Sequence, residues 1–320
     1  MLARNCLCVS LLLFTAGWAH AQSYPAKTVR IVVPFPAGGS VDLVARLIGQ
    51  KLGESLGQQF IVDNRAGAAG NIGTDFVAKA APDGYTLLVS GSAPLAANVS
   101  LYAKLPFDPL RDFAPVIQIV NQPNVLVLHP SVPSRSVKDF IALVKSRPGK
   151  LNYASAGTGG SQHMAAALFV TMTGVDIVHV PYKGGAPALN DLVGGQVDFM
   201  FETAPTAAPF IKAGKLRALA VTSAQRSITM PDIPTMQEAG LAGFDYRGWV
   251  GMVAPAATPK EIIARLNSEV QQALSGDLRK RLSDLSLDVA GGTPDQFAAF
   301  MREDIARYSK LVKAAGITPQ

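Results

Sequence analysis

Cysteine is nearly absent from this chain of 320 residues, and both cysteines, Cys6 and Cys8, lie within the first ten positions. Beyond Cys8 there is no thiol, which excludes disulfides, thiol nucleophiles and thiolate metal ligands from the remainder of the chain. A protein of this length does not need a disulfide to hold its core. We therefore expect an ordinary packed core.

Long apolar runs are also scarce, and the one at the start predicts a removable leader. Arg4 precedes the apolar stretch "CLCVSLLLFTAGWA", and Ala19, His20 and Ala21 fit the small-x-small cleavage rule. The cysteines precede the apolar stretch, which argues against a lipoprotein. The stretch is short for a spanning helix, and no later one is long enough. We expect a signal peptide at 1–21, cleavage near Ala21 and a soluble secreted protein.

Clustered positive charge is missing too. The formal net charge is +6, and it becomes +5 without Arg4, the only charged residue in the expected leader. Lysine and arginine are scattered, as in "KSRPGK" and "LRKRLSD", whereas a nucleic-acid surface would need a stripe of them. The sequence therefore predicts no nucleic-acid partner, and its mild positive charge weakly favours anionic small ligands.

Catalytic and metal motifs are equally hard to find. The histidines beyond the leader, His129, His163 and His179, show neither H-x-x-x-H nor H-E-x-x-H spacing, so no zinc site is expected. In "GTGGS", Ser161 follows the glycines instead of lying between them, unlike the serine of a G-x-S-x-G elbow. We expect no metal, no cofactor and no catalytic residue. A secreted hydrolase that uses Ser161 stays an alternative.

What the chain does contain is an alternation of strand-like and helix-like segments. The order "TVRIVVPF", 41–56, "QFIVDN", "GNIGTDFVAKAA" and "YTLLVSG" is βαβαβ, which predicts a parallel sheet. The pattern restarts near Asn121 and continues to two C-terminal helices, at 259–275 and 294–315. We expect two α/β lobes, each a sheet flanked by helices, with a ligand cleft between them. The expected lobes are 22–121 plus 247–320, and 122–246.

Glycine-rich turns follow several of these strands. Gly38 and Gly39 precede Ser40 and Asp42, either of which could cap the next helix. Backbone N–H groups at a helix start form an anion site, although a tight turn without a ligand stays an alternative. "GTGGS" is a second glycine-rich turn of this kind before a helix. The two turns together favour an anion held between the lobes. Other candidates at strand ends are Ser90, Ser92, Tyr182, Lys183, Gly184 and Thr203.

The motifs together resemble a known family. They are "YPAKTVRIVVPFPAGGSVDLVAR", "VDNRAGAAGNIGTDFVAKAAPDGYTLLV", "YASAGTGGSQHMAAALF", "VPYKGGAPALNDLVGGQVDFMF", "GKLRALAVTS" and "PDIPTMQEAGL". The chain resembles the Bug-type solute-binding proteins, which are the extracytoplasmic receptors of tripartite tricarboxylate transporter systems. The resemblance covers nearly the whole chain after the leader.

This resemblance implies a periplasmic binding protein of two lobes, type II-like, that closes on a small organic carboxylate. It implies a monomer that delivers its ligand to the membrane components of the transporter, and a receptor that presents the ligand to a signalling partner is an alternative. The ligand-binding residues that we expect are Phe35, Ala37, Gly38, Gly39, Ser40, Ser90, Ser92, Thr158, Gly159, Gly160, Ser161, His163, Tyr182, Lys183, Gly184 and Thr203. No arginine lies in these loops, which favours a monocarboxylate or a neutral distal group, although Arg247 could approach from the second crossing.

Overall fold

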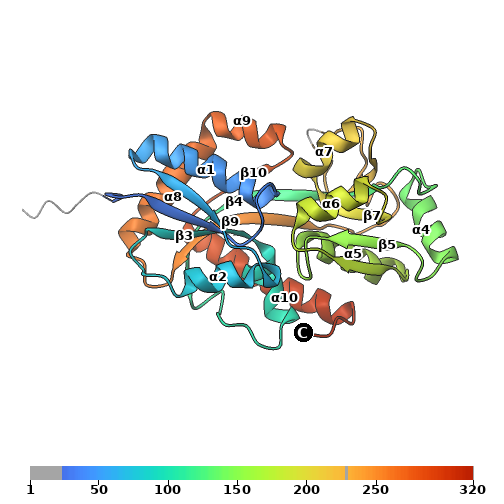
Figure 1. Ribbon diagram of the computed structural model, residues 1–320, viewed down its shortest axis with the longest axis horizontal. Coiled ribbons are helices and arrows are strands. Elements are labelled where there is room, and N and C mark those ends of the chain that lie inside the picture. The colour runs from blue at the N-terminus through green and yellow to red at the C-terminus, as the bar shows by residue number, and fades with distance from the viewer. Residues whose placement is uncertain (1–23, 228–229, 320) are drawn as a thin grey trace, which may run out of the picture.

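A computed structural model describes residues 24–227 and 230–319. The expected signal peptide lies outside the described residues. The fold is α/β, with a curved mixed sheet that carries helices on both faces (Figure 1). Strands follow one another in the order β2-β1-β3-β9-β4-β7-β5-β6, and β8 and β10 each pair with β4. Two lobes lie side by side along the longest axis, and the sheet passes through both.

The first lobe has parallel strands at its outer edge, as the βαβαβ pattern predicts. β1 pairs in parallel with both β2 and β3, and β9 then runs antiparallel to β3. Its strands are β1 (Val29–Val33), β2 (Phe60–Asn64), β3 (Thr86–Gly91), β9 (Arg247–Pro255) and β10 (Asp288–Gly291). Its helical segments are α1 (Ser40–Leu56), η1 (Ala68–Gly70), α2 (Asn71–Ala78), η2 (Ala93–Ala97), α3 (Asn98–Leu101), α8 (Lys260–Ser275), α9 (Asp277–Asp284) and α10 (Pro294–Ala314).

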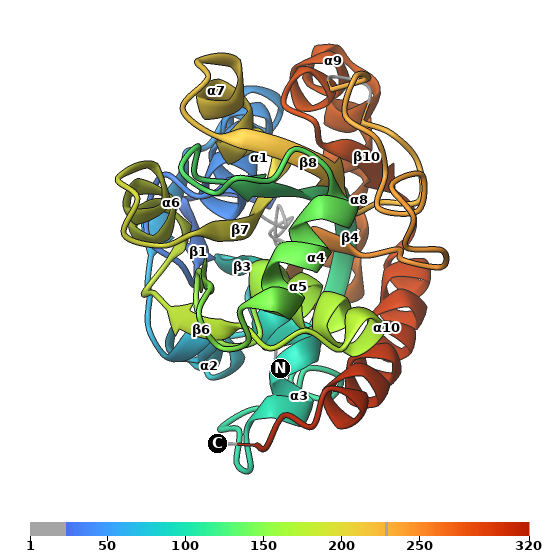
Figure 2. The same cartoon turned by 90° about the vertical axis from the view of Figure 1, so that its right-hand side faces the viewer.

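The second lobe follows the same layered plan. β5 pairs in parallel with β6 and β7, and β4 pairs antiparallel with β7 and β8. Its strands are β5 (Asn152–Ser155), β6 (Val178–Pro181), β7 (Phe199–Thr203) and β8 (Arg217–Val221). Its helices are α4 (Val137–Ser146), α5 (Ser161–Thr173), α6 (Gly185–Val193) and α7 (Ala204–Lys212). In Figure 2, α4 and α5 lie on one side of its strands, and α6 and α7 on the other.

The strand β4 (Phe113–Leu128) joins the two lobes. Its residues up to Pro123 pair with β9, and those from Asn124 pair with β7. The sequence predicts a strand only at "NVLVLHP", after a restart of the pattern near Asn121, whereas β4 already begins at Phe113 and is shared by the sheets of both lobes. The longer strand was not predicted because it contains Pro115 and Pro123, and proline usually marks the end or edge of a strand. The predicted division at 121 and 122 falls inside β4 and stays a prediction.

Alternate residues of the strands pack against helices on opposite faces. In the first lobe, Ile31 belongs to the same buried cluster as α1 and α8, whereas Val32 belongs to the cluster of α10. In the second lobe, Phe201 packs with α4 and α5, and Met200 packs with α6 and α7. Both faces of each half-sheet are therefore covered, which leaves the ends of the strands as the place for a ligand.

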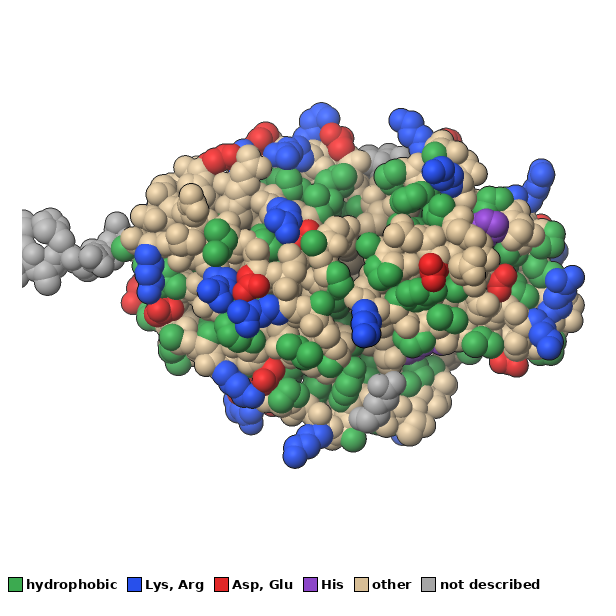
Figure 3. Space-filling view, viewed as in Figure 1, with side chains coloured by type: hydrophobic (Ala, Val, Ile, Leu, Met, Phe, Trp, Pro, Cys, Tyr) green, Lys and Arg blue, Asp and Glu red, His purple; other side chains and the backbone are tan. Residues whose placement is uncertain are grey.

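The surface shows no concentration of one charge on the face drawn in Figure 3, where lysine and arginine side chains alternate with aspartate and glutamate. This distribution agrees with the scattered basic residues of the sequence. Over residues 24–227 and 230–319, no helix has both the length and the apolar character needed to cross a bilayer.

Candidate functional site

A cavity lies where the carboxyl ends of β1, β3, β5 and β7 converge from the two lobes. Its volume is about 670 Å³, including the space at its mouth. The first lobe, with the crossing strands, contributes Phe35, Pro36, Ala37, Gly39, Ser40, Val41, Asp42, Gly91, Ser92, Ala93, Gln122 and Trp249. The second lobe contributes Ala156, Gly160, Ser161, Gln162, Gly185, Ala186, Glu202, Thr203 and Thr206. Within residues 24–227 and 230–319, no lysine or arginine belongs to this lining.

The loop after β1 forms one wall, and Asp42 holds it in place. One oxygen of Asp42, Oδ2, accepts the Gly38 N–H at 3.0 Å and the Arg46 Nε–H at 3.0 Å. The Asn64 side-chain amide donates to Asp42 Oδ1 at 2.9 Å and to the Phe35 carbonyl at 3.0 Å. Burial raises the pKa of the Asp42 carboxyl, but the hydrogen bonds from Arg46, Gly38 and Asn64 outweigh it and the pKa is lowered. The loop is therefore fixed before any ligand arrives.

This bonding differs from the cap that the sequence predicts. Gly39 is the residue before α1, and no side chain accepts a hydrogen bond from the first turn of that helix. Asp42 instead bonds back to the loop. The first N–H groups of a helix have no acceptor within the helix, so those of α1 are available where Ser40 and Val41 line the cavity.

The glycine-rich loop after β5 forms the facing wall. Gly157 and Gly159 have φ values of 124° and 84°, which favour glycine, and Gly160 precedes α5. The Gly160 N–H donates to the Gly157 carbonyl at 3.2 Å. At the start of α5, Ser161 lines the cavity, and its hydroxyl accepts from the Asn124 amide at 3.4 Å. A second helix N-terminus therefore opens into the same space as that of α1.

His163 supports this loop from behind and does not line the cavity. Its Nδ1 accepts the Gly159 N–H at 3.1 Å, and its ring stacks on that of His179 at 4.4 Å between centroids. His179 in turn bonds to Ser155 Oγ at 2.7 Å through Nε2. Burial lowers the pKa of His163 to about 4. Burial, together with the neighbouring His163, lowers the pKa of His179 to about 3. Both imidazoles are neutral near pH 7, and no Ser–His nucleophilic pair is formed by Ser161.

Two of the predicted glycines bring the lobes into contact. A Cβ atom on Gly184 would lie 2.8 Å from Pro36 Cγ, and one on Gly159 would lie 2.5 Å from Asn98 Oδ1. Pro36 and Asn98 belong to the first lobe, whereas both glycines belong to the second. These glycines are therefore needed where the lobes touch beside the cavity.

The predicted site residues divide into two groups by position. Those that line the cavity are Phe35, Ala37, Gly39, Ser40, Ser92, Gly160, Ser161 and Thr203. Those outside the lining are Gly38, Ser90, Thr158, Gly159, His163, Tyr182, Lys183 and Gly184. Among the second group, the Tyr182 hydroxyl donates to Asp191 Oδ2 at 2.6 Å, which raises the pKa of Tyr182 to about 12. Lys183 is exposed. Contact of any of these residues with a ligand stays a prediction.

Sequence reasoning missed several polar residues of the lining. Gln122 lies on β4 and Trp249 on β9, where these two strands cross between the lobes. Glu202 precedes Thr203 at the end of β7, yet only Thr203 was predicted to face a ligand. Gln162 and Thr206 lie in the first turns of α5 and α7. Position at a strand end or helix start was the available signal for Glu202, Gln162 and Thr206.

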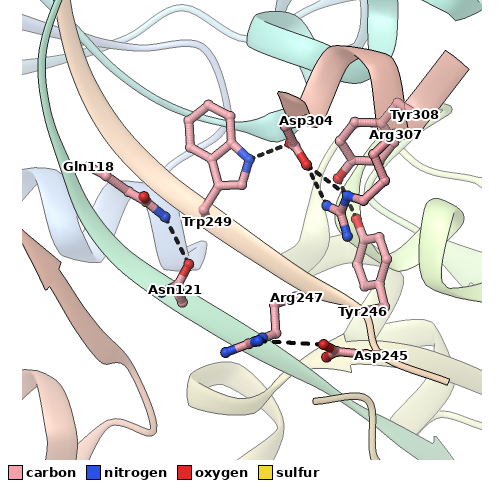
Figure 4. A network of polar contacts seen from close by, with 9 residues as sticks. All are labelled: Gln118, Asn121, Asp245, Tyr246, Arg247, Trp249, Asp304, Arg307 and Tyr308. Carbon is pink, nitrogen blue, oxygen red and sulfur yellow. Dashed lines mark hydrogen bonds and ion pairs between the residues drawn. The ribbon is translucent and has the colours of Figure 1, made fainter. Parts of the chain in front are cut away.

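Trp249 connects the cavity to a polar network on its far side (Figure 4). Its Nε1–H donates to Asp304 Oδ2 at 2.6 Å, and Arg307 Nε donates to Asp304 Oδ1 at 2.9 Å. The hydroxyls of Tyr246 and Tyr308 lie 2.8 Å apart in the same network. Burial raises the pKa of Asp304, although Arg307 and Trp249 oppose that shift.

Arg247 lies in this second region, where it bonds to Asp245 at 3.4 Å. It does not belong to the lining of the cavity described above. Within the described parts of the chain, no group of three or more His, Cys, Asp or Glu side chains could hold a metal ion.

Comparisons with known proteins agree with this architecture. The profile of a family described as "Tripartite tricarboxylate transporter family receptor", TctC, matches residues 44–317. The solved structure of R. palustris Rpa4515 with adipate is 40% identical, with a TM-score of 0.91, and the match covers 93% of this chain and 100% of that one. For the periplasmic binding protein BugD the identity is 36%, the TM-score 0.88 and the coverage 93% and 100%. MatC from Rhodopseudomonas palustris with bound malate is 38% identical, with a TM-score of 0.86, and the match covers 90% of this chain and 100% of that one.

Proposed function

Because this chain belongs to the family of tripartite tricarboxylate transporter receptors, TctC, we propose that it is a periplasmic solute-binding receptor. It captures one small organic carboxylate between its lobes and delivers it to the membrane components of a tripartite transporter. Similar proteins are known with adipate and with malate, which supports a carboxylate ligand. The receptor acts as a monomer and catalyses no reaction.

The observation that carries the proposal is the pair of helix starts facing one cavity. The N-termini of α1 and α5 both open into it, and neither begins with a side-chain cap. Backbone N–H groups and the helix dipole stabilise an anion at such positions. The hydroxyl of Ser161, which accepts a hydrogen bond from Asn124, adds a donor from the second lobe. A carboxylate is therefore held by N–H and O–H groups rather than by a cationic side chain.

Closure of the lobes follows from a ligand that contacts both walls. Such a ligand favours the arrangement in which the loop at Pro36 meets Gly184, because only that arrangement provides both sets of contacts. Exclusion of water then strengthens the hydrogen bonds between amides and carboxylate. Gly184 and Gly159 permit the close approach.

The lining also restricts the far end of the ligand. Lys183 is exposed and Arg247 lies in a different region, so no cation among the described residues lines the cavity to meet a second full negative charge. This supports a monocarboxylate, or a ligand whose distal group is neutral or can share a proton.

Calorimetry with a panel of carboxylates, including adipate, malate and benzoate, tests the proposal together with native mass spectrometry for a co-purified acid. Loss of one hydrogen bond in Ser161→Ala should weaken binding by about three- to tenfold. Thr173→Ala is the control, since Thr173 lies at the opposite end of the same helix, α5, and outside the lining. Absence of any bound carboxylate in both measurements would refute the proposal.

Two further measurements separate the alternatives. Uptake of the ligand should be lost when the gene is deleted, whereas binding with unchanged uptake would indicate a receptor for a signalling partner. Turnover of an ester panel that Ser161→Ala abolishes would indicate a hydrolase. That outcome is not expected, because the His163 ring is already bonded to Gly159 and stacked on His179.

A further inference from the structure

The side-chain amide of Gln122 lies at the wall of the cavity without a hydrogen bond. Gln122 belongs to β4, is 4% exposed and lines the cavity. Its Oε1 is fully buried and has no partner among the described residues. Its Nε2 has no partner among them either, but it is not one of the fully buried atoms. The amide nitrogen is therefore the polar atom with which Gln122 reaches the cavity.

The alternation of side chains along β4 directs Gln122 toward the start of α5. Successive side chains of a strand point to opposite faces of the sheet. Asn121 lines the second region beside α10, whereas the Asn124 amide donates to the Ser161 hydroxyl at 3.4 Å. Gln122 follows Asn121 by one position and precedes Asn124 by two. It therefore shares the face of β4 from which Asn124 contacts Ser161.

A glycine on β9 lies between Gln122 and Ser161. Gly248 is the register partner of Gln122, and a Cβ atom on it would lie 3.1 Å from Ser161 Cβ and 3.4 Å from Gln122 Nε2. The amide nitrogen and Ser161 therefore flank the same glycine. Because α5 begins at Ser161, the amide nitrogen lies beside the helix start that opens into the cavity.

An amide in this state is costly to the ligand-free protein. Removing a polar group from water costs free energy unless a hydrogen bond replaces those to water. The other amide of the lining, that of Gln162, makes such bonds, because its Oε1 accepts the Ala156 N–H at 3.3 Å and its Nε2 donates to Glu202 at 3.3 Å. An apolar side chain of similar size at position 122 would avoid the cost. A group of this kind is expected at a binding site, where a ligand supplies the missing partner.

We propose that Gln122 binds the ligand by donating a hydrogen bond from Nε2 to a carboxylate oxygen that lies beside Ser161. This inference rests on the proposed function. An ionised carboxylate only accepts hydrogen bonds, so the donor end of the amide is the end that meets it. The contact adds β4, the strand that runs through both lobes, to the two helix starts that hold the ligand. It restricts this part of the site to ligand groups with an acceptor oxygen.

The first test removes the donor and keeps the size of the side chain. Calorimetry with adipate and malate should show binding to Gln122→Met that is weaker than to wild type by at least about tenfold, the effect of losing a hydrogen bond to a charged group. Gln118→Met is the matched control, because Gln118 lies on the same strand but outside the lining, and its amide donates to Asn121 at 2.8 Å (Figure 4). Its affinity should stay within about twofold of wild type. Wild-type affinity in Gln122→Met would overturn the proposal.

Stability without ligand separates binding from a structural role. The thermal midpoint of ligand-free Gln122→Met should equal or exceed that of wild type, because no hydrogen bond within the protein is lost. That of Gln118→Met should fall, since the bond to Asn121 is lost. A midpoint of Gln122→Met that falls as far as that of Gln118→Met would show that the amide of Gln122 supports the fold, and would overturn the proposal.

The contact can also be observed in wild type, where the stability of a variant does not matter. In protein labelled with ¹⁵N-glutamine, the side-chain NH₂ signals that are absent from the spectrum of Gln122→Met belong to Gln122. Saturation with adipate or malate should shift these signals and slow their exchange with water, and the signals of Gln118 should not respond. Unchanged Gln122 signals in a saturated sample would overturn the proposal.

The outcomes distinguish this inference from the proposed function. If no carboxylate of the panel binds to wild type, the proposed function fails and the inference fails with it. If carboxylates bind, but Gln122→Met binds them as tightly as wild type does, only the inference fails and the proposed function stands.

Discussion

Replacing Asp42 with alanine should destabilise the first lobe and weaken ligand binding at the same time, because one carboxylate holds the loop that leads into α1. The side chain is 5% exposed and accepts hydrogen bonds from Gly38, Arg46 and Asn64. Of these three donors, Gly38 is the one that belongs to the loop backbone, and its N–H group bonds to Asp42 Oδ2. The alanine variant leaves that N–H without its acceptor.

The magnitude follows from what each partner retains. Asn64 keeps the Phe35 carbonyl at 3.0 Å, and Arg46 keeps Asn64 Oδ1 at 3.1 Å. Because the Arg46 side chain is 52% exposed, its ion pair with Asp42 contributes at most about 1 kcal/mol. The part-buried hydrogen bond from Gly38 to a charged group adds about 1.5–3 kcal/mol. We therefore expect the free energy of unfolding to fall by about 1.5–4 kcal/mol.

Urea denaturation at pH 7 measures this change, and calorimetry with a bound carboxylate measures the affinity, which should fall by about tenfold as the loop loses its fixed shape. Asp42→Asn retains an acceptor and should lose less stability than the alanine variant. The control Asp284→Ala removes an exposed ion pair with Lys280 and should cost less than about 1 kcal/mol. Ligand affinity equal to wild type in Asp42→Ala would refute the role of Asp42 in shaping the loop.

The pH dependence of the same variant provides a second check. The pKa of Asp42 is lowered in the folded state, so its contribution to stability is present above its ordinary value of 3.8 and is lost as the pH falls through the lowered value. The unfolding free energies of wild type and Asp42→Ala should therefore converge in strong acid. A constant difference down to pH 2 would contradict the assigned hydrogen bonds.

Three other predictions concern groups around the site. Between pH 7 and pH 5, the free energy of unfolding of wild type should fall by about 2 kcal/mol more than that of His179→Asn. The reason is that the histidine binds a proton in the unfolded state, whereas the buried ring, with its pKa of about 3, does not. An equal fall in both proteins, measured by urea denaturation at each pH, would contradict this. Gly184→Ala should weaken ligand binding more than about tenfold by obstructing the approach of the lobes at φ 144°, and an unchanged calorimetric Kd would exclude that contact from closure. Asp304→Asn should lower the free energy of unfolding by about 2–3 kcal/mol because the partly buried Arg307 loses its charged partner; a thermal midpoint equal to wild type would contradict it.

The sequence predicted the elements well wherever one periodicity continued without interruption. The segments that became β1, α1, β3, α5 and β7 are examples, and the parallel pairing of β1 with β2 and β3 is confirmed. The long strand β4 was not recognised, because Pro115 and Pro123 interrupt its pattern. Proline is tolerated there since β4 carries register shifts between Pro115 and Ile117 and changes partners after Pro123.

The sequence indicated the loops that line the cavity, but not the lining residues Gln122 and Trp249 on β4 and β9. The glycines and hydroxyls at "PFPAGGS" and "GTGGS" mark strand ends, and parallel strands bring such ends together. Glu202 was harder to assign, because a glutamate beside a threonine has no pattern that tells which one faces the cavity. Gln122 and Trp249 could not be assigned at all, since their position depends on how β4 and β9 cross from one lobe to the other.

Trp249 gives the protein an optical property of its own. The chain has two tryptophans, and the other, Trp18, lies in the expected signal peptide, so Trp249 is the single indole of residues 22–320. It lies at the wall of the cavity, with its Nε1–H bonded to Asp304. A ligand that enters the cavity should change the surroundings of this ring, and the emission spectrum should shift as a result. Occupancy of the cavity can therefore be followed by tryptophan fluorescence of the unlabelled protein, in stopped flow as well as at equilibrium. The tryptophan signal then comes from one known position.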